Sequence, residues 1–357
     1  MDFGIAFPSY INAWRDAQIA EANGFSHAWF YDSQLLYSDV YATMALVAEH
    51  TRTIKLGTLV AVPTNRIAPV TASAVATINA LAPGRVILGI GAGGTARNSM
   101  GLHQVKVKDL SSYVQQVRGL LAGEDVLFRE GDAERWIRLL HRDRARGYIN
   151  LDDPIEVHVA ANGPRALRIA AEHGDGWITV VQQPKAIQGC LETIAEARGD
   201  EEPPYSTLLQ SGACVLRDGE SLTSPRVVQR LGPAVLARAH AAWETLRGGA
   251  GLGLRDDELG ERYGEYVDAY AEGIGSPADR RYLDVHEGHL VYMKPGEEAF
   301  VDERGIARTF VGSPEQLLER IHRLEEAGVR HIAIQVVGTD GRELIEEFGK
   351  KILAKVN

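Results

Sequence analysis

Three glycines at the end of an apolar run could bring a phosphate-bearing redox cofactor close to the backbone. Gly89, Gly91 and Gly94 in the stretch RVILGIGAGGTARN fit the G-x-G-x-x-G spacing of a dinucleotide-binding loop. Such a loop must open a helix at once, because the helix N-terminus holds the pyrophosphate. Residues 95–108 lack a helical pattern, and the motif follows the fourth predicted strand instead of the first. A Rossmann fold is therefore not expected, and a tight turn at the end of the strand is the structural alternative.

Two further loops combine small and polar residues where predicted strands end. The segment AANGP ends one strand and begins a helix at Pro164, so the amides around Asn162 and Gly163 are free to meet an anion. The next strand ends near Thr179, whose hydroxyl is expected at the same edge. The two loops predict a phosphate cradle, with candidate binding residues Ala161, Asn162, Gly163, Pro164, Thr179 and Val180.

Short apolar runs alternate with longer amphipathic segments along most of the chain. Strands are expected at 3–7, 27–31, 54–62, 85–91, 155–161, 176–181, 207–216 and 331–337. Helices are expected at 13–23, 40–49, 68–81, 110–121, 164–172, 184–196, 314–327 and 342–353. Because the strands lack in/out alternation, they require a parallel sheet covered by helices. Eight such units predict an α/β fold, a (β/α)8 TIM barrel spanning 1–357 as a single domain, with the loops above at its rim.

Two segments interrupt this repeat. Residues 123–153 are expected to form an irregular insertion, and residues 217–308 a mostly helical insertion after strand seven that lies over the barrel mouth. The glycine-rich residues 248–254 within it are expected to act as a hinge or mobile lid. Both insertions are expected to select the substrate.

Composition excludes several classes of partner. The 357 residues are 45% hydrophobic and 24% charged, and their formal net charge of −10 gives no general attraction to nucleic acid or to an anionic membrane. The basic run at 135–146 predicts a solvated face, with contacts to an anionic cofactor tail or substrate as the alternative. Two separate cysteines and no apolar stretch of about 18 residues favour a cytoplasmic protein outside the membrane.

Metal catalysis is not expected. His286 and His289 in the sequence HEGH lack the H-E-x-x-H spacing that places two ligands on one helical face. A surface position, or a role in a lid over the substrate, is the expectation for both.

The chain resembles a known family in segments that together span nearly the whole barrel. FGIAFP (3–8), AEANGFSHAWFYDS (20–33) and residues 54–93, 157–177 and 312–332 are similar to the luciferase-like flavin- or deazaflavin-dependent oxidoreductases. Within that family they resemble the branch that contains 5,10-methylenetetrahydromethanopterin reductase. The resemblance implies a bacterial-luciferase-like barrel and a homodimer.

The resemblance also implies a cofactor and a reaction. The first expectation is coenzyme F420, with hydride transfer between the reduced deazaflavin and a small organic substrate. An FMN-dependent luciferase-like monooxygenase is the alternative, and a non-catalytic flavin-binding protein is the second alternative. All three have the same fold.

Individual residues take their expected roles from this resemblance. Leu59 and Val60 match the place where the family holds a cis peptide beneath the cofactor ring, and AANGP matches the loop that binds the tail phosphate. Asp32 matches an acidic residue near the ring, with a buried hydrogen-bonding role as the alternative. The remaining expected contacts are Gly91, Ala92 and Gly93 for the cofactor, and Ser33 and Asn65, with Asp32, for catalysis.

Two departures from the family pattern concern the proton donor. Ser33 stands where several deazaflavin-dependent relatives have a histidine, and residues 92–94 (AGG) stand where some have an acidic side chain. The proton relay of those relatives is therefore not expected here, and Ser33 could instead donate a hydrogen bond to a ring carbonyl.

Overall fold

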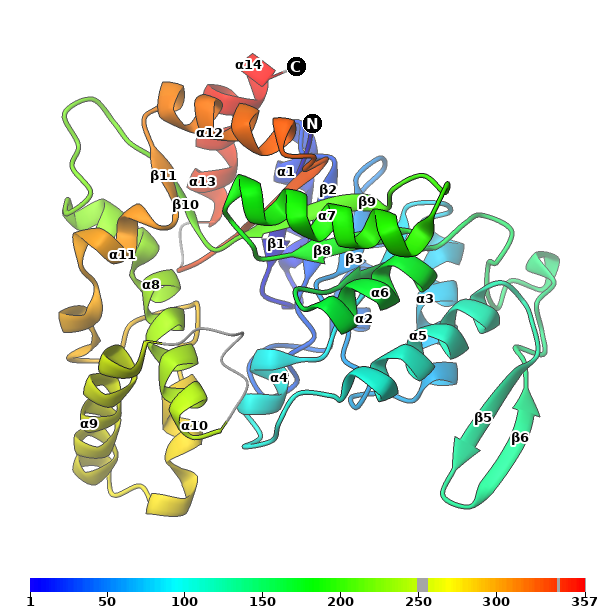
Figure 1. The fold of residues 1–357 in the computed structure, drawn as a ribbon. Helices are drawn as coiled ribbons and strands as arrows, with labels where there is room; N and C mark the ends of the chain where they lie inside the picture. The colour runs from blue at the N-terminus through cyan, green and yellow to red at the C-terminus, as the bar shows by residue number, and fades with distance from the viewer. Residues whose placement is uncertain (249–255, 339–340, 357) are drawn as a thin grey trace.

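The chain forms a closed barrel of parallel strands. The computed structural model describes residues 1–357 except 249–255, 339–340 and 357 (Figure 1). Around the barrel the strands follow the order β1-β12-β9-β8-β7-β4-β3-β2. Their bounds are β1 (Asp2–Phe7), β2 (His27–Phe30), β3 (Lys55–Thr58), β4 (Val86–Ile90), β7 (Glu156–Ala160), β8 (Gly176–Thr179), β9 (Tyr205–Gln210) and β12 (His331–Gln335). The predicted TIM barrel is confirmed, and a closed sheet has no place for a Rossmann topology.

Helices pack around the outside of the barrel (Figure 1). They are α1 (Ala13–Ala22), α2 (Val40–His50), α3 (Ala68–Leu81), α5 (Val107–Leu121), α6 (Pro164–His173), α7 (Pro184–Arg198), α12 (Pro314–Glu326), α13 (Gly341–Phe348) and the C-terminal α14 (Ala354–Val356). Proline opens α6, α7 and α12, because its missing N–H is not needed in the first turn. At α12, Ser313 and Gln316 complete a capping box that fixes the start of the helix.

The interior of the barrel changes character along its axis. An apolar layer near the middle is formed by side chains that include Trp29, Leu59 and Ile178. Toward the amino ends of the strands this layer gives way to buried imidazoles of His27 and His331, whose ring centroids lie 4.3 Å apart. The barrel is therefore a packed core, and ligands must bind at its ends.

Three strand and helix predictions differ from the structure. The third strand ends at Thr58, because Leu59-Val60 is cis and Ala61 makes only an isolated bridge. Strand seven is two strands, since the chain turns at Gly212 (φ 73°) and β10 (Ala213–Val215) pairs outside the barrel with β11 (Phe310–Gly312). The prediction that no helix follows the glycine loop is wrong, because α4 (Gly94–Asn98) begins there at once.

Residues 123–153 are more regular than predicted. They contain an antiparallel hairpin of β5 (Val126–Glu130) and β6 (Ala133–Ile137) that projects from the barrel (Figure 1). The segment joins α5 to β7, and the Asn79 side-chain amide at the end of α3 donates to the carbonyls of Asn150 and Asp153 at 3.0 and 2.9 Å. These contacts tie the end of the segment to the end of α3, and a role of the segment in selecting the substrate stays a prediction.

The basic run lies on this projecting segment. Its arginines are exposed, and they pair locally, as in Arg138 with Asp125 and Arg144 with Asp153, both at 2.8 Å. The exposure and the local ion pairs fit the predicted solvated face, while the alternative of contacts with a cofactor tail or substrate stays a prediction.

The segment from 217 to 308 is helical in its described part. It contains α8 (Pro225–Leu246), α9 (Asp257–Ile274), α10 (Arg281–His286) and α11 (Glu303–Ala307). Helices α8 and α9 pack through a cluster that includes Trp243 and Tyr263. Residues 249–254 of the predicted hinge lie outside the described residues.

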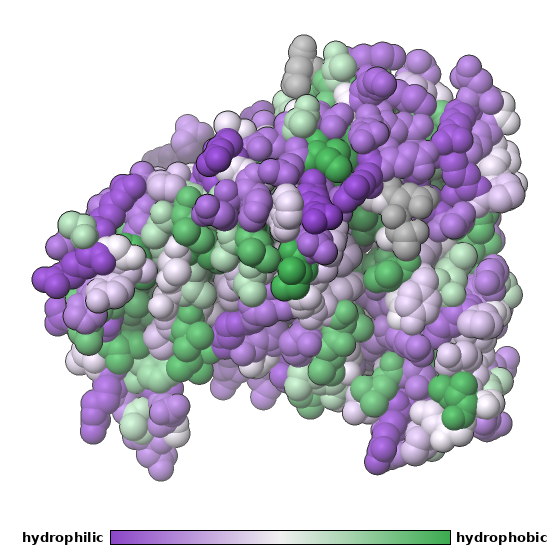
Figure 2. Space-filling model, turned by 180° about the vertical axis from the view of Figure 1, so that it is seen from behind, coloured by the Kyte–Doolittle hydropathy of each residue, from purple (hydrophilic) through white to green (hydrophobic). Residues whose placement is uncertain are grey.

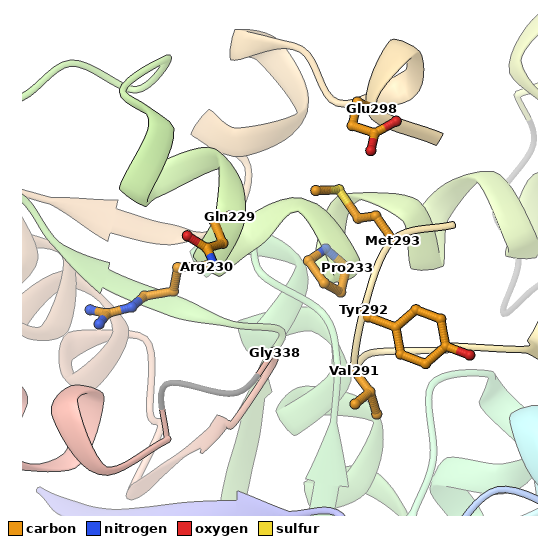
Figure 3. A pocket seen from close by; sticks show the side chains of 8 residues that line it. All are labelled: Gln229, Arg230, Pro233, Val291, Tyr292, Met293, Glu298 and Gly338. Atoms are coloured by element: carbon orange, nitrogen blue, oxygen red, sulfur yellow. The ribbon is translucent and has the colours of Figure 1, made fainter. Parts of the chain in front are cut away.

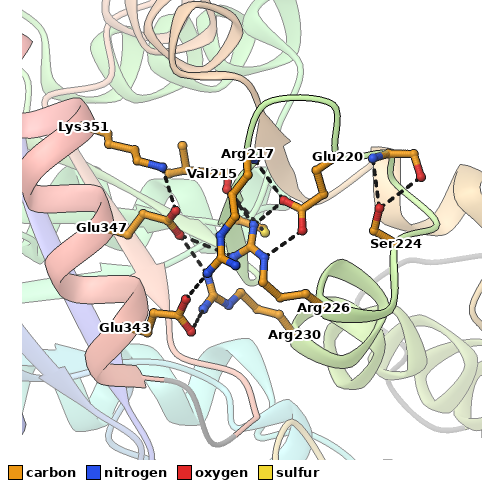
Figure 4. Close-up of polar contacts among 11 residues, drawn as sticks. Val215, Arg217, Glu220, Ser224, Arg226, Arg230, Glu343, Glu347 and Lys351 are labelled. Atoms are coloured by element: carbon orange, nitrogen blue, oxygen red, sulfur yellow. Dashed lines mark hydrogen bonds and ion pairs between the residues drawn. The ribbon is translucent and has the colours of Figure 1, made fainter.

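An ion-pair network joins α8 of this segment to α13 (Figure 4). The buried Arg230 guanidinium lies 2.7 Å from the Glu343 carboxylate and 3.1 Å from that of Glu347. Arg226 pairs with Glu220, and this contact lowers the pKa of Glu220 to about 2. The network fixes α8 against α13.

The outer surface is mixed. Hydrophobic side chains form separate groups among hydrophilic ones on the face seen in Figure 2. Among the described residues, no helix is long and apolar enough to cross a membrane.

Candidate active site

The predicted catalytic residues come together at the carboxyl end of the barrel. Asp32 and Ser33 follow β2, and Asn65 lies in the loop after β3. The Asn65 side-chain amide donates to the Asp32 carbonyl at 3.2 Å and to the Gln34 side-chain oxygen at 2.9 Å. The rim loops after β2 and β3 are therefore tied to each other directly.

Asp32 is a buried partner in an ion pair. Its side chain is 4% exposed, and Oδ1 lies 2.9 Å from Nη1 of Arg66. Oδ2 accepts a hydrogen bond from the backbone N–H of Val62 at 3.3 Å, while Arg66 also contacts Asp39. With both carboxylate oxygens engaged, Asp32 holds the two rim loops in place, as the buried hydrogen-bonding alternative predicts.

Ser33 and two tyrosines line the same corner. Ser33 is buried, and its carbonyl accepts the backbone N–H groups of Leu36 and Tyr37. The Tyr31 hydroxyl donates to the Ala6 carbonyl at 2.8 Å, and burial raises the pKa of both Tyr31 and Tyr37. Both phenols therefore remain protonated at neutral pH.

The segment after α10 contacts this corner. The Tyr37 hydroxyl donates to the carbonyl of His289 at 3.0 Å. A Cβ on Gly101, which follows α4, would lie 3.2 Å from the ring of Tyr282 in α10. The rim loops after β2 and β4 thus touch the helical segment 217–308.

Gly91 and Gly93 in the glycine loop after β4 allow close packing between the ends of neighbouring strands. A Cβ on Gly91 would lie 2.6 Å from Cγ2 of Val60 and 3.1 Å from Cβ of Ala160. Gly93 has φ 76°, a left-handed conformation that favours glycine, and a Cβ there would lie 2.5 Å from Val62. These glycines are therefore explained by the tight strand exit, the structural alternative considered above, whether or not a ligand approaches. Ala92 joins them through its carbonyl, which accepts from the N–H of Val105.

The residues predicted to form a phosphate cradle lie together at the ends of β7 and β8. The Asn162 side-chain oxygen accepts from the Thr179 hydroxyl at 2.9 Å and from the Val180 N–H at 3.5 Å. Asn162, Gly163 and Pro164 are exposed, and α6 starts from Gly163 without a side-chain cap. The Thr179 hydroxyl lies at the expected edge, where it holds the Asn162 side chain.

Ala161 supports the cradle from below. Its carbonyl accepts from the indole N–H of Trp177 at 2.8 Å, and its N–H donates to Ile178. With these groups engaged, the backbone positions that can face a ligand are those of the exposed residues after it.

Two cavities lie away from the predicted residues. One, of about 230 Å³, lies beside α8 and the 291–298 segment, where Pro233, Met293 and Tyr292 face it (Figure 3). The other, of about 410 Å³, opens at the amino end of the barrel and is lined by residues that include His27, Lys55 and Tyr205. No predicted site residue lines either one, so the rim geometry and not the cavities defines the candidate active site.

Sequence reasoning missed Arg66 and the burial of the HEGH histidines. Arg66 follows Asn65 directly, and the signal for it was a cation near the acidic Asp32 in a predicted rim loop. His286 and His289 are buried, so the expectation of a surface position is wrong. The Leu59-Val60 peptide bond is cis, as the resemblance implied.

Comparison with known proteins gives one family and several relatives. A family model described as luciferase-like monooxygenase matches residues 8–331. The 5,10-methylenetetrahydromethanopterin reductase of Methanolobus tindarius is 28% identical over 360 residues, which cover 99% of this chain and 100% of the relative.

Solved structures share the fold. The coenzyme F420 dependent tetrahydromethanopterin reductase of Methanopyrus kandleri aligns with a TM-score of 0.64 at 20% identity, covering 100% of this chain and 99% of the other. The oxygenating constituent of 3,6-diketocamphane monooxygenase from Pseudomonas putida, in complex with FMN, aligns with a TM-score of 0.66 at 15% identity, covering 99% and 98%.

Proposed function

Because the chain belongs to the luciferase-like monooxygenase family, we propose that it is an oxidoreductase that transfers hydride between reduced coenzyme F420 and a small organic substrate. The observation that carries the proposal is the 28% identity with a methylenetetrahydromethanopterin reductase along the whole chain. The Methanopyrus kandleri reductase of the same fold is coenzyme F420 dependent, which supports the choice of cofactor.

The residues at the rim fit such a cofactor. Helix α6 starts at Pro164 without a side-chain cap, and the turn at Asn162 and Gly163 is exposed, so the positive end of the helix can favour an anion such as the tail phosphate. No atom lies within 4 Å of the position that a Cβ on Gly163 would take, so a phosphate can approach the backbone. Leu59 and Val60, which pack in one cluster with Ala160 at the end of β7, offer apolar side chains to a planar ring at the mouth.

Each group of residues has a separate task in this proposal. Asn162 and Gly163 would bind the phosphate, and Pro164, which has no N–H, would contact it only through its ring, while Thr179 and Val180 hold the Asn162 side chain in position. When bound, the reduced deazaflavin supplies the hydride.

The polar corner at the ends of β2 and β3 would orient the ring edge. Ser33 would donate a hydrogen bond to a ring carbonyl, and Asn65 would hold the loop that carries Leu59 and Val60. Asp32 is a positioning residue, because its carboxylate is occupied by Arg66 and Val62. The segment around His289 would limit the entry of water from above.

An FMN-dependent monooxygenase is the second candidate, because an FMN-bound monooxygenase has the same fold. It uses the same phosphate cradle but needs molecular oxygen. The two candidates therefore differ in the cofactor that binds and in oxygen consumption.

The test measures binding of F420 and of FMN by fluorescence titration, together with oxygen uptake in the presence of the reduced cofactors. We expect F420 to bind more tightly and no oxygen uptake coupled to substrate. Tighter binding of FMN with substrate-dependent oxygen uptake would establish the monooxygenase, and binding of neither would refute both.

A matched pair of variants tests the phosphate cradle. Gly163→Ala adds a methyl group to the exposed turn, and we expect F420 affinity to fall by about tenfold, which corresponds to about 1.4 kcal/mol. Gly189→Ala in α7 is the control, because a Cβ there also meets no atom within 4 Å. Neither variant should lower the melting temperature, and Gly189→Ala should raise it slightly because alanine favours a helix interior. Equal F420 affinities for the two would count against the cradle.

A further inference from the structure

Three histidines lie close together inside the helical segment 217–308. His240 lies in α8, His286 ends α10, and His289 follows in the next turn. One ring nitrogen of each lies within 4.8 Å of those of the other two. All three side chains are buried, at 3%, 3% and 7% exposure. Buried imidazoles that face one another need a shared partner.

The hydrogen bonds among the three histidines do not occupy every ring nitrogen, so some nitrogens can bind such a partner. Nδ1 of His240 and Nδ1 of His289 lie 2.9 Å apart. Nδ1 of His286 is buried and makes no hydrogen bond in the described structure. A buried nitrogen without a partner costs about 1–3 kcal/mol, so an additional ligand at this point would be favourable.

Carboxylates stand behind two of the three rings. Nε2 of His286 lies 3.0 Å from Oε1 of Glu244, and Nε2 of His240 lies 3.9 Å from Oε1 of Glu297. A carboxylate on the far nitrogen of a metal-binding histidine fixes the ring and raises its basicity. The His286 ring is therefore held by Glu244 through Nε2, while Nε2 of His240 makes no hydrogen bond within the described part of the chain and the Nδ1 atoms of His240 and His289 face each other.

The charges around the cluster also favour a cation. The ammonium of Lys294 lies 3.0 Å from Glu297 and balances that carboxylate, which also accepts from the Tyr263 hydroxyl at 2.6 Å. Glu244 has His286 as its ion-pair partner among the described residues. Its negative charge is left to be balanced by a cation bound to the imidazoles.

We propose that His240, His286 and His289 bind a divalent transition-metal ion of the zinc class. Imidazole nitrogen is a preferred ligand of Zn²⁺, and three histidines leave a fourth position open to water or to a ligand. Zn–N bonds of about 2.1 Å hold tetrahedral nitrogens about 3.4 Å apart, so the observed spacings require only small side-chain shifts.

The ion would tie α8 to the segment that contacts the rim. His289 accepts the hydrogen bond from Tyr37, and Leu290 beside it has φ 64°, a strained conformation for a bulky residue. Metal binding would therefore stabilise the segment that faces the corner of Ser33 and Tyr31.

The experiment begins with chelator-treated full-length protein. It is dialysed against Zn²⁺ with excess Mg²⁺, which competes for surface carboxylates, and bound metal is counted by mass spectrometry. We expect one zinc per chain in the wild type and a melting temperature several degrees above that of the metal-free protein. His240→Gln and His286→Gln should each lose the zinc.

His322→Gln is the matched control, because His322 is an exposed histidine that also faces a carboxylate, with its side chain 69% exposed. It should retain one zinc. X-ray absorption of the zinc-loaded wild type, which requires no variant to fold, should show three imidazole nitrogens at about 2.0–2.1 Å. Less than half an equivalent of zinc in the wild type, a different ligand set, or full retention by both His240→Gln and His286→Gln would overturn the proposal.

Discussion

Replacing His27 tests whether the stability of the protein depends on an uncharged imidazole at the amino end of the barrel. The His27 side chain is 3% exposed, stacks on Trp29 and lies beside His331. Burial, and secondly the Lys55 ammonium, lower the pKa of His27 from 6.5 to about 4, while Asp2 acts in the opposite direction. The folded chain therefore keeps this ring neutral in a pH range where the unfolded chain protonates it.

The sign and size of the effect follow from this difference. Between pH 6.5 and 4 the unfolded state binds more protons at His27, so the stability that this group contributes above pH 6.5 is lost as the pH falls. At one pKa unit per 1.36 kcal/mol, the loss at pH 5 is about 2 kcal/mol. His27→Gln removes the titrating group and should reduce the pH dependence by about that amount.

The assay is urea unfolding followed by tryptophan fluorescence at pH 7.5 and pH 5. The free energy of unfolding of the wild type should fall more than that of His27→Gln, while the exposed control His322→Gln should follow the wild type. Equal pH dependence in wild type and His27→Gln, or an NMR titration of His27 near pH 6.5, would refute the reasoning.

Three further outcomes are expected. Gly91→Ala should lower the free energy of unfolding by about 1–3 kcal/mol in chemical denaturation, because its Cβ would lie 2.6 Å from Val60 Cγ2; a wild-type midpoint would contradict this. Arg66→Met should lower the free energy of unfolding by about 3 kcal/mol in chemical denaturation, because it leaves the Asp32 carboxylate buried without its ion pair. Adding Asp32→Asn to the same chain should recover part of the loss, and additive losses would argue against the coupling. Light scattering should give twice the mass of one chain, and a single-chain mass would refute the homodimer that the family resemblance implies.

Much of the barrel could be predicted because its signals are local. The helix over 68–81 was predicted with the bounds that the structure gives, since its apolar positions and its proline near the start act within a few residues. The cis bond at Leu59-Val60 was predicted from the family resemblance, because spacing and composition give no signal for it.

The wrong secondary-structure predictions occur where contacts between distant parts of the chain, or the lack of an apolar pattern, determine the local structure. The split of strand seven depends on pairing between Cys214 and Val311, which are far apart in the chain. The short helix at Gly94 lacks an apolar stripe and starts from the left-handed Gly93, so its pattern resembles a loop. Hairpin β5 and β6 lies largely exposed and therefore has no alternation between a buried and an exposed face.

The candidate site shows the same division. The loops that hold Asp32, Asn162 and Thr179 were predicted together, because strand order in a barrel brings carboxyl ends to one rim. The buried hydrogen-bonding role of Asp32 was among the alternatives, but its partner Arg66 and the partner of the Thr179 hydroxyl could not be predicted, since both depend on side-chain geometry. The histidine cluster was missed because His240 comes from a different helix from the HEGH motif.

A crystal structure of the protein with bound F420 tests the central claim most directly. The account predicts the tail phosphate at the start of α6, beside Asn162 and Gly163, and the deazaflavin ring against Leu59 and Val60. Cofactor density in the cavity beside Pro233 and Met293 or in the one beside Lys55 and Tyr205, or a phosphate held elsewhere with the α6 turn left to solvent, would contradict it.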